Sequence, residues 1–468
     1  VKATWLPARP NTDTALLLGI AYVLYEENLY DKDFLKKYTE GFEKFLSYLL
    51  GATDGISKNA AWAANICDLK EHEIISLARK MAHSRTMISV SWSLTRQDHG
   101  EQAFWTAITV ASMLGQIGLP GGGFGFGYSA TNHIGGQFTA PPAKPFPQGK
   151  NAINNFIPVA RISDLLLHHG ESFEFNGETH VYPETKIIYW AGGNPFHHHQ
   201  DLNRLVRAWQ KPDTIISNEW CWNSLAKRSD IVLPCTSSFE REDIALTPRD
   251  PYVILMSKLT EPHGQSKDDF EIFSGLADAM GVKEKFTEGR TAKQWTEWLY
   301  NETRKTASQS NLRMPLYEEF LKDGWFKFKD PTETTIMLKS FRDDPKKNAL
   351  KTPSGKIEIF SETVARFEYK DCQGHPIWQE PCEWLGKVGS PYQLHLISNQ
   401  PKNKLHSQLD HGSISLAAKI RGREPVSINP IDAKHRQLKK NDIVRVFNAR
   451  GECFAAVKYD NNLRPGVV

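Results

Sequence analysis

The chain has 468 residues, of which 40% are hydrophobic and 24% charged, and its formal net charge at pH 7 is +3. This length predicts about three domains with sizeable cores, and the near-neutral charge argues against a general nucleic-acid-binding surface. The six cysteines form no C-x-x-C pair, which argues against zinc and iron–sulfur sites, and no apolar run reaches the roughly 18 residues of a membrane helix.

Helical periodicity dominates the first part of the chain. It predicts a helix that begins near Asp13, then helices over about 31–48, 58–66 and 71–83. Residues 86–90 are a short β-rich run, and a helix near 99–118 ends in a Gly-rich sequence, as helix C-termini favour. Residues 119–150 are rich in Gly, Pro and Asn, so we expect an irregular segment, and such a long loop typically has a functional role.

Strands and helices alternate in the middle of the chain. The sequence predicts strands at 186–190, 214–217, 230–233 and 252–256, with helices at 198–210 and 268–280. This alternation is typical of a mainly parallel sheet covered by helices. Residues 290–390 are mixed, with a helix at 294–303. A new domain begins near Pro391, where β-type runs at 392–397, 443–447 and 453–458 predict an all-β barrel.

The segment Tyr189–Asp201 is the most informative of the chain. It reads YWAGGNPFHHHQD: an apolar strand, two glycines, Asn-Pro, and three histidines that open a helix. Open α/β sheets hold nucleotides at the carboxyl ends of strands, and Gly192 and Gly193 allow backbone amides to approach an anion. The plain alternative is a glycine turn with a solvated His cluster. Adjacent histidines cannot all face one ion, so we expect no metal site here.

Several motifs in the same order along essentially the whole chain resemble one family. They are GGNPFHHHQD at 192–201, RAWQKP at 207–212, DIVLP at 230–234, FEREDI at 239–244, LGQIG at 114–118, SGKIEI at 354–359 and LHSQL at 405–409. The chain resembles the molybdenum reductases that carry bis(molybdopterin guanine dinucleotide). It looks most similar to the branch that reduces trimethylamine N-oxide, dimethyl sulfoxide, biotin sulfoxide and methionine sulfoxide.

The resemblance implies an α/β fold with parallel sheets flanked by helices, followed by a β-barrel. We expect an α/β cofactor-binding portion at 1–150, an α/β dinucleotide-binding domain with a mixed insertion at 151–390, and a truncated dinucleotide-binding barrel at 391–468. The implied cofactor-binding residues are Asn11, Thr12, Asp13, Trp92, Ser93, Arg96, Asn194, His198, Asn218, Glu219, Arg241, Asp269, Ser398, Asn399, Gln400, Pro401, Lys404, His406, Ser407 and Gln408.

Chemistry supports such a set, because pyrophosphate needs amides, hydroxyls and cations, and guanine needs a carboxylate or amide facing its N1 and N2 donors. Asp269 is the expected guanine partner. Asn11 stands where relatives usually carry Gly. Lys404 stands where many carry Arg, so a bidentate contact would become a point charge.

Each of these residues also has a structural alternative. For Asp13 the alternative is a helix cap, worth about 1 kcal/mol. For Arg96 and Arg241 it is a structural salt bridge, and for His197 and His199 it is a hydrated position at the rim. We expect the middle group to lie along one rim of the sheet, faced by the loop 398–408; that group is Asn194, His198, Asn218, Glu219, Arg241 and Asp269.

The implied activity is oxygen-atom transfer from an S-oxide or N-oxide, with a c-type cytochrome or another reductant as electron donor and the periplasm as location; the cytoplasm is the alternative. The molybdenum-ligating serine of this branch belongs to its N-terminal portion, so no residue here is assigned as catalytic or as a metal ligand. We interpret the chain as a fragment without that portion and without the extreme C-terminus, inactive by itself.

The sequence leaves three other functions to consider. A formate dehydrogenase or nitrate reductase type would carry the same cofactor, but the motifs at 192–201 and 405–409 favour the oxide reductases. A nicotinamide-dependent dehydrogenase needs G-x-G-x-x-G directly after a strand, whereas the Gly-rich run 121–127 follows a helix. A non-catalytic remnant is the third.

Overall fold

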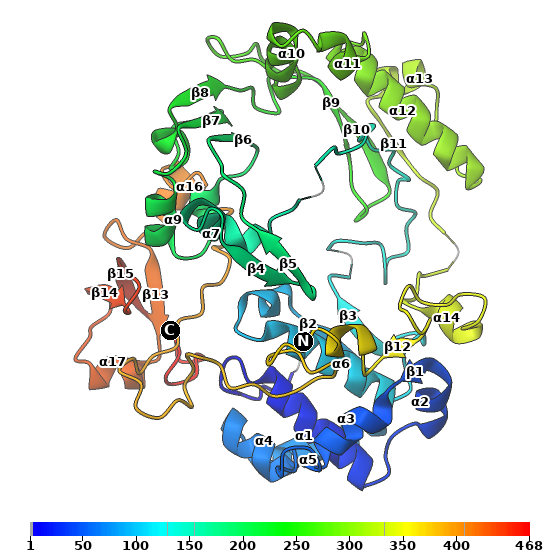
Figure 1. Cartoon of the computed structure of the whole chain (residues 1–468), viewed down its shortest axis with the longest axis vertical. Helices are drawn as coiled ribbons and strands as arrows, with labels where there is room; N and C mark the ends of the chain where they lie inside the picture. The colour runs from blue at the N-terminus through cyan, green and yellow to red at the C-terminus, as the bar shows by residue number, and fades with distance from the viewer. Residues whose placement is uncertain (1–2, 129, 154, 332, 407) are drawn as a thin grey trace.

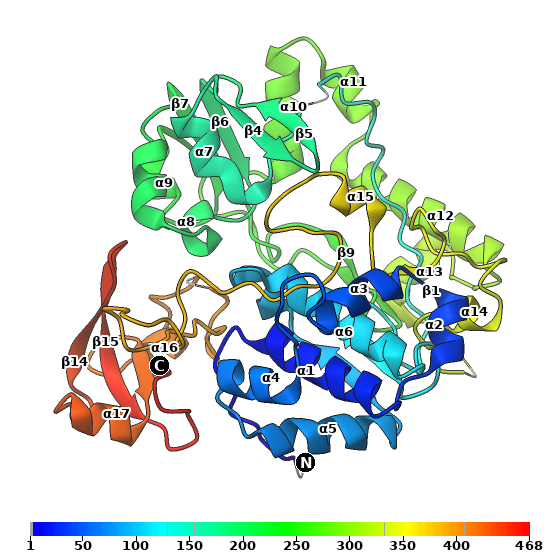
Figure 2. The ribbon, with the colours of Figure 1, turned by 60° about the horizontal axis from the view of Figure 1, so that its bottom comes forward.

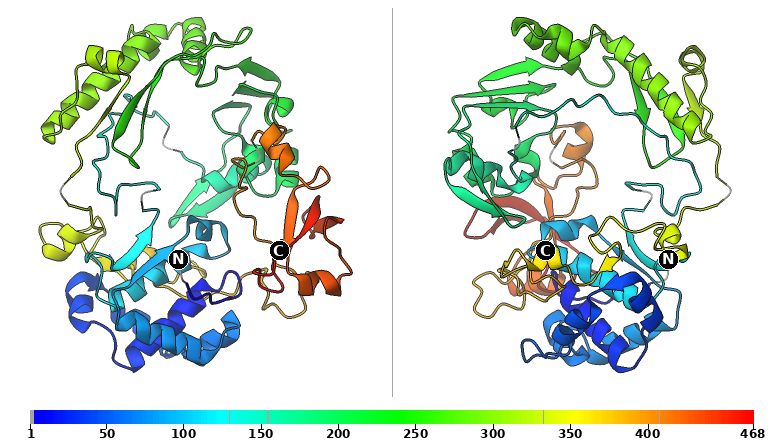
Figure 3. Two further views of the ribbon diagram at one scale, coloured as in Figure 1. Left: turned by 180° about the vertical axis from the view of Figure 1, so that it is seen from behind. Right: turned by 45° about the vertical axis from the view of Figure 1, so that its right-hand side comes forward.

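The computed structural model describes residues 3–128, 130–153, 155–331, 333–406 and 408–468. Helices of the N-terminal part lie at the bottom of Figure 1, a green α/β unit lies above them, and the orange and red C-terminal part lies beside both. Figure 3 shows the same arrangement from behind. Each part has its own hydrophobic core.

The N-terminal part is a helical layer around α1. Its elements are α1 (Asp13–Glu26), α2 (Lys32–Tyr38), β1 (Thr39–Glu40), α3 (Phe42–Leu49), α4 (Ala60–Cys67), α5 (Glu71–Ala82) and α6 (Gly100–Met113). Helix α1 contacts α4, α5 and α6, which explains why it is apolar nearly all round (Figure 2). The single helix expected over 31–48 is wrong, because Gly41, with φ of 80°, separates α2 from α3. A Cβ on Gly41 would lie 2.3 Å from the Cβ of Phe360.

The segment expected to be irregular contains one strand. Strand β3 (Gly123–Phe126) pairs in parallel with β2 (Met87–Val90), and β2 leads into the 3₁₀ helix η1 (Trp92–Arg96). Strand β1 pairs in parallel with β12 (Ile357–Glu358). The described residues between 127 and 150 form no further helix or strand of this sheet.

The middle of the chain holds the parallel sheet that was expected. Strands β6 (Ile187–Ala191), β7 (Thr214–Glu219) and β8 (Ile231–Pro234) are parallel, in the order β6-β7-β8. Around them lie η2 (Val159–Arg161), α7 (Ile162–Leu167), α8 (Pro195–His198), α9 (Leu202–Ala208), η3 (Ala226–Arg228) and the hairpin of β4 (Ser172–Phe175) with β5 (Glu178–Val181). The single helix expected at 198–210 is wrong, because α8 ends at His198 and Asp201, with φ of 45°, caps a new helix.

The strand 252–256 does not extend this sheet as expected. It is β10 (Tyr252–Met256), which lies antiparallel between β9 (Asp243–Leu246) and β11 (Trp325–Lys327). Residues 247–251 turn the chain back on itself, so β9 and β10 form a hairpin instead of a crossover. The helices of this region are α10 (Asp269–Ala279), α11 (Lys283–Thr287), α12 (Ala292–Gln309), α13 (Tyr317–Asp323), α14 (Lys339–Asp343) and α15 (Glu362–Ala365).

The C-terminal part is a small sheet, and no closed barrel is present in its described residues. Strand β15 (Glu452–Tyr459) pairs in parallel with β13 (Pro425–Ile428) and antiparallel with β14 (Ile443–Phe447). The strand expected at 392–397 contributes only the bridge between His395 and Val467. A barrel closes only when both edge strands find partners, and here β13 and β14 are edges. Helices α16 (Ser413–Ala417) and α17 (Pro430–His435) complete this part.

Contacts between distant segments fasten the C-terminal part to the rest. The guanidinium of Arg464 donates to the carbonyl of Pro7 and to the carboxylate of Asp68. The guanidinium of Arg450 forms two hydrogen bonds with Glu383, at 2.7 and 2.8 Å. No helix among the described residues is long and apolar enough to span a membrane.

Candidate cofactor site

A cavity of about 640 Å³ lies where β6, β7 and β8 end. Five of the residues expected to bind cofactor line it, from the sheet, from α10 and from the C-terminal loop: Asn194, Asn218, Glu219, Asp269 and Gln408. The carboxyl ends of parallel strands lie at one edge of the sheet. At this edge Asn194 and Asp269, which are 75 positions apart in the sequence, line the same cavity as Gln408 of the C-terminal loop. We call this the sheet-edge cavity.

The glycine turn after β6 forms one wall of this cavity. Gly192 and Gly193 have φ of 78° and 76°, which side chains rarely adopt, while a Cβ on Gly192 would meet nothing within 4 Å. Glycine is therefore favoured at both positions by the positive φ angle and not by a lack of room for a side chain. The Oδ1 atom of Asn194 accepts from Phe196 N at 2.9 Å and so caps α8. Because α8 has only four residues, it supplies little of the expected helix dipole.

A hydrogen-bond chain fixes the carboxylate of Asp269 at the edge of the cavity. The hydroxyl of Tyr189 donates to Oδ1 of Asn218 at 2.9 Å, and Nδ2 of Asn218 donates to Oδ1 of Asp269 at 2.8 Å. Asn218 is buried whereas Asp269 is exposed. The Oδ2 atom of Asp269 has no hydrogen bond within the described part of the chain, so one oxygen is held and the other is available.

Several lining residues were not found by sequence reasoning. Lys227 and Arg228, on η3, are the cations that line this cavity, and the guanidinium of Arg228 lies 4.7 Å from the ring centre of Phe196. Trp220 and Trp222 are 54% and 69% exposed at the rim. The position of this segment directly after β7 could have identified these residues from the sequence, since loops at that edge of a parallel sheet contact ligands.

Buried and clustered ionisable groups surround the same cavity. Burial raises the pKa of Glu219, against a hydrogen bond from Asn223. Burial, and then neighbouring imidazoles, lower the pKa of His197, His198 and His199. A lowered pKa favours the neutral imidazole, so the triplet is poorly suited to supply positive charge for a phosphate. The ring of His198 lies 6.1 Å from that of His406, which links the C-terminal loop to the turn after β6.

Arg241 does not line this cavity. Its guanidinium pairs with the carboxylate of Asp243, and it lines a second cavity of about 390 Å³ that shares only Asp269 with the first. The geometry thus matches the salt-bridge alternative stated for Arg241. His198 is the other residue expected at the rim that does not line the sheet-edge cavity. Its ring lies against that of His406.

The two N-terminal groups of expected residues meet each other. Asn11 has φ of 63°, in the left-handed region that glycine favours and asparagine tolerates. The Oγ1 atom of the fully buried Thr12 donates to Arg9 O, and Thr12 makes no side-chain cap. Asp13 accepts from Nε2 of Gln97 at 3.4 Å, directly after the 3₁₀ helix that carries the second group: Trp92, Ser93 and Arg96.

In the C-terminal loop, Lys404 is already paired. Its side chain is 7% exposed, and its ammonium contacts the carboxylates of Asp410 and Glu424. Nε2 of Gln400 donates to Lys404 O at 2.8 Å. Ser407 lies outside the described residues. The sheet-edge cavity is lined by Gln408 and not by the other expected loop residues, which are Ser398, Asn399, Gln400, Pro401, Lys404 and His406.

Comparison with known families is decisive. A model of the molybdopterin oxidoreductases matches residues 1–279, and one of the molybdopterin dinucleotide binding domain matches residues 394–468. The chain belongs to the molybdopterin oxidoreductase family. The family's cofactor is a molybdenum-bearing molybdopterin guanine dinucleotide, and the sequence-based resemblance is confirmed.

Relatives of this molybdopterin oxidoreductase include S-oxide and N-oxide reductases. It is 45% identical over 468 residues to the biotin sulfoxide reductase of Cereibacter sphaeroides, covering 100% of this chain and 63% of that protein. It is 44% identical over 491 residues to the trimethylamine-N-oxide reductase of Haemophilus influenzae, covering 100% of this chain and 59% of that protein. The chain thus spans about three fifths of the length of these relatives.

A solved structure shares the fold. Acetylene hydratase from Pelobacter acetylenicus matches with a TM-score of 0.71 at 19% identity, over 99% of this chain and 63% of that one. The expected fold class, α/β with parallel sheets flanked by helices, is confirmed. At this identity the likeness concerns the fold alone.

The sheet-edge cavity of this family member fits one half of a guanine dinucleotide. Its glycine turn and Lys227 suit the pyrophosphate, and the free oxygen of Asp269 suits the N1 and N2 donors of guanine. Its volume of about 640 Å³ is within the range of small-molecule and cofactor sites.

Proposed function

We propose that a polypeptide containing these residues is a molybdenum-dependent reductase that removes an oxygen atom from an S-oxide or N-oxide. The observation that carries the proposal is the Tyr189–Asn218–Asp269 chain at a parallel-sheet edge, in a family member whose relatives are named for such oxides. We propose a bis(molybdopterin guanine dinucleotide) cofactor, held between the three portions 1–150, 151–390 and 391–468. We further propose a periplasmic location and a small redox protein as electron donor.

The chain's own residues would act by binding and orientation. Asp269 accepts from guanine through its free oxygen, while Asn218 and Tyr189 hold that carboxylate in place. Lys227 neutralises phosphate charge, and the glycine turn brings amides close to it. When bound, the molybdenum cofactor supplies two-electron oxygen-atom transfer, and the protein supplies position and a water-poor surrounding.

The remaining expected binding residues form two further proposed contacts. Asn11, Asp13, Trp92, Ser93 and Arg96 would hold a second dinucleotide. The support is that Asp13 contacts Gln97, which directly follows the 3₁₀ helix carrying Trp92, Ser93 and Arg96. The loop around His406 and Gln408 would close over the first, because it meets both His198 and the cavity lining.

The test compares the 468-residue chain with a longer polypeptide that contains it. Molybdenum and guanine nucleotide are measured per chain, and oxidation of a reduced viologen is followed after addition of trimethylamine N-oxide or biotin sulfoxide. We expect the longer polypeptide to contain molybdenum and to reduce at least one oxide, and the 468-residue chain to be inactive. A longer polypeptide that loads molybdenum but reduces neither oxide type would overturn the substrate class, and one that loads none would overturn the whole proposal.

A further inference from the structure

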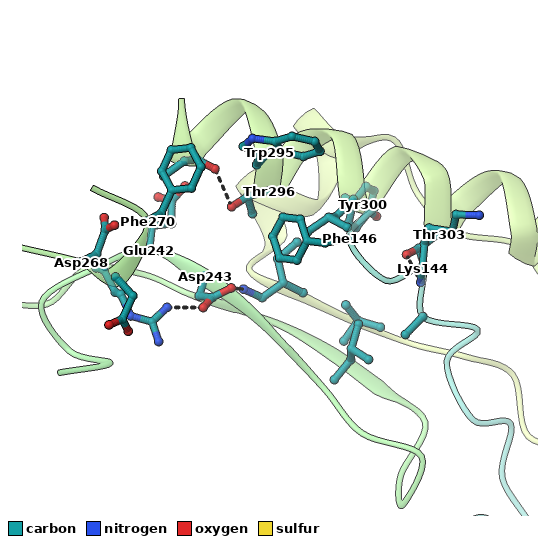
Figure 4. A pocket seen from close by; sticks show the side chains of 18 of the residues that line it. Lys144, Phe146, Glu242, Asp243, Asp268, Phe270, Trp295, Thr296, Tyr300 and Thr303 are labelled. Carbon is teal, nitrogen blue, oxygen red and sulfur yellow. Dashed lines mark hydrogen bonds and ion pairs between the residues drawn. The ribbon is translucent and has the colours of Figure 1, made fainter. Parts of the chain in front are cut away.

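The second cavity, of about 390 Å³, lies between β9, α12 and the start of α10, and residues 143–146 pass over it (Figure 4). It shares Asp269 with the sheet-edge cavity but is otherwise lined by different residues. We call it the aromatic cavity, for the four rings that line it: Phe146, Phe270, Trp295 and Tyr300.

These rings offer apolar surface. The rings of Phe146 and Trp295 meet edge to face, with centroids 5.6 Å apart. Trp295 Nε1 donates to Thr287 O at 3.1 Å, and the hydroxyl of Tyr300 donates to Pro315 O at 3.1 Å. Because the polar atoms of both side chains are bonded to backbone carbonyls, the small surfaces that these two rings expose are carbon; Trp295 is 5% and Tyr300 2% exposed, and the guanidinium of Arg290 already lies 4.6 Å from the Trp295 ring centre. Phe146, which is 52% exposed, therefore offers the largest ring surface of the four.

The charged groups around the rings carry an excess of carboxylates. Four acids line the cavity against two bases, and one base, Arg241, is paired with Asp243. This leaves three carboxylates and the ammonium of Lys144; the three are Glu242, Asp268 and Asp269. Asp268 uses one oxygen to cap α10, accepting from Glu271 N at 2.8 Å.

Glu242 is the carboxylate best placed for a ligand. It is exposed at the cavity, and it has no hydrogen bond or ion pair within the described residues. Phe270 and Thr296 lie beside it in Figure 4. Aromatic faces attract cations through their quadrupole, and a carboxylate at the same site adds a direct charge interaction.

We propose that the aromatic cavity binds an organic monocation, namely an amine or quaternary ammonium on an aromatic or branched apolar body. The rings would contact the apolar body, and Glu242 and Asp268 the positive end. A dinucleotide phosphate is disfavoured there, since three carboxylates would repel it and Arg241 is already paired. The binding does not depend on the proposed reductase activity.

Calorimetric titration of the 468-residue chain with three probes tests the proposal: phenethyltrimethylammonium, 3-phenylpropionate and GMP. The first two have similar apolar bodies and opposite charges. We expect saturable binding of the cation, at least about tenfold tighter than the anion. Equal or tighter binding of the anion, absence of saturable cation binding, or displacement of the cation by GMP would each overturn it.

Two pairs of variants locate the site. We expect Glu242→Gln to weaken cation binding about three- to tenfold, and Phe146→Ala to weaken it by a similar factor. Phe146 is 52% exposed, so its removal leaves the fold intact, as circular dichroism would verify. The matched controls are Glu261→Gln and Phe239→Ala, which change exposed residues outside the cavity and are expected to have no effect. Equal effects of variants and controls would refute the location.

Discussion

Asp269 at the sheet-edge cavity and Lys404 in the C-terminal loop are both charged residues expected to bind the cofactor, and they differ in what already holds them. Asp269 is exposed, with one oxygen bonded to Asn218 and the other unbonded within the described residues. Lys404 is 7% exposed and contacts two carboxylates, Asp410 and Glu424. The first charge is positioned and available, whereas the second is already neutralised inside the protein.

Residue type alone therefore does not make a binding group. A charged side chain serves a ligand when the protein fixes its geometry without using its full bonding capacity.

Replacing the available charge should have the largest effect. In a cofactor-loaded polypeptide, Asp269→Ala should weaken retention of guanine dinucleotide about ten- to a hundredfold, because a charge-assisted hydrogen bond contributes about 1.5–3 kcal/mol. Molybdenum and guanine nucleotide per chain after dialysis are the measurements. The control is Asp278→Asn on the same helix, where the carboxylate contacts only Lys283. Unchanged cofactor content in Asp269→Ala would assign that carboxylate to a purely structural role.

Removing the support should have a smaller effect. Tyr189→Phe deletes the hydrogen bond to Asn218 but keeps the ring beside Phe273, so retention should fall about two- to tenfold. The readout is cofactor content together with the affinity for GMP relative to AMP, since misplacing the carboxylate reduces base selectivity. Tyr252→Phe, which changes an exposed tyrosine on β10, is the control. A drop in thermal stability with unchanged base selectivity would show that Tyr189 serves packing alone.

Replacing Lys404, whose charge is already neutralised, should change the stability of the protein more than its binding of cofactor. Lys404→Met removes the ammonium that Asp410 and Glu424 share, while Asp410 keeps its contact with Lys419 at 2.6 Å. We expect a loss of about 1 kcal/mol in unfolding free energy, measured by urea titration, and less than a twofold change in cofactor retention. A large loss of cofactor at unchanged stability would restore Lys404 as a direct ligand.

The smallest effect should depend on pH. Hydrogen bonds from Lys404 and Lys419 outweigh burial and hold the pKa of Asp410 at about 2. A depressed carboxyl pKa contributes stability above the unfolded pKa of about 3.9, and that contribution is lost as pH falls toward 2. The side chain is 45% exposed, so Asp410→Asn should cost less than about 1 kcal/mol at pH 7. The difference between wild type and variant should shrink as pH falls from about 4 to 2 and vanish below pH 2, and a constant difference from pH 7 to pH 2 would contradict the ion-pair explanation.

Local sequence signals predicted most of the framework. The parallel strands at 187–191, 214–219 and 231–234 follow from apolar runs that end in glycine or polar residues, and the meeting of Asn194, Asn218 and Asp269 follows from parallel topology. The ends of helices within apolar runs were harder to predict. Gly41 and Asp201 each separate two helices through positive φ angles, and tertiary contacts, which local periodicity does not show, select these angles.

Two further features depended on long-range contacts. The pairing of β3 with β2 gives a strand to a Gly-rich sequence with weak β-propensity. The pairing of Lys404 joins it to Glu424, twenty residues away, and no local pattern encodes that contact. Lys227 and Arg228 were overlooked because no motif marked them, although their place after β7 puts them at the ligand edge.

The contacts of Arg464 have a consequence for synthesis of the protein. Pro7 and Asp68 leave the ribosome long before Arg464, which is 457 residues after Pro7, so their final partner arrives only when almost all of this chain has been translated. Helices α1, α4 and α5 can pack as they emerge, whereas their junction with the C-terminal sheet must wait. During this interval the unjoined surfaces are exposed to the cytosol, which makes chaperone protection of the nascent chain most useful before Arg464 has been added.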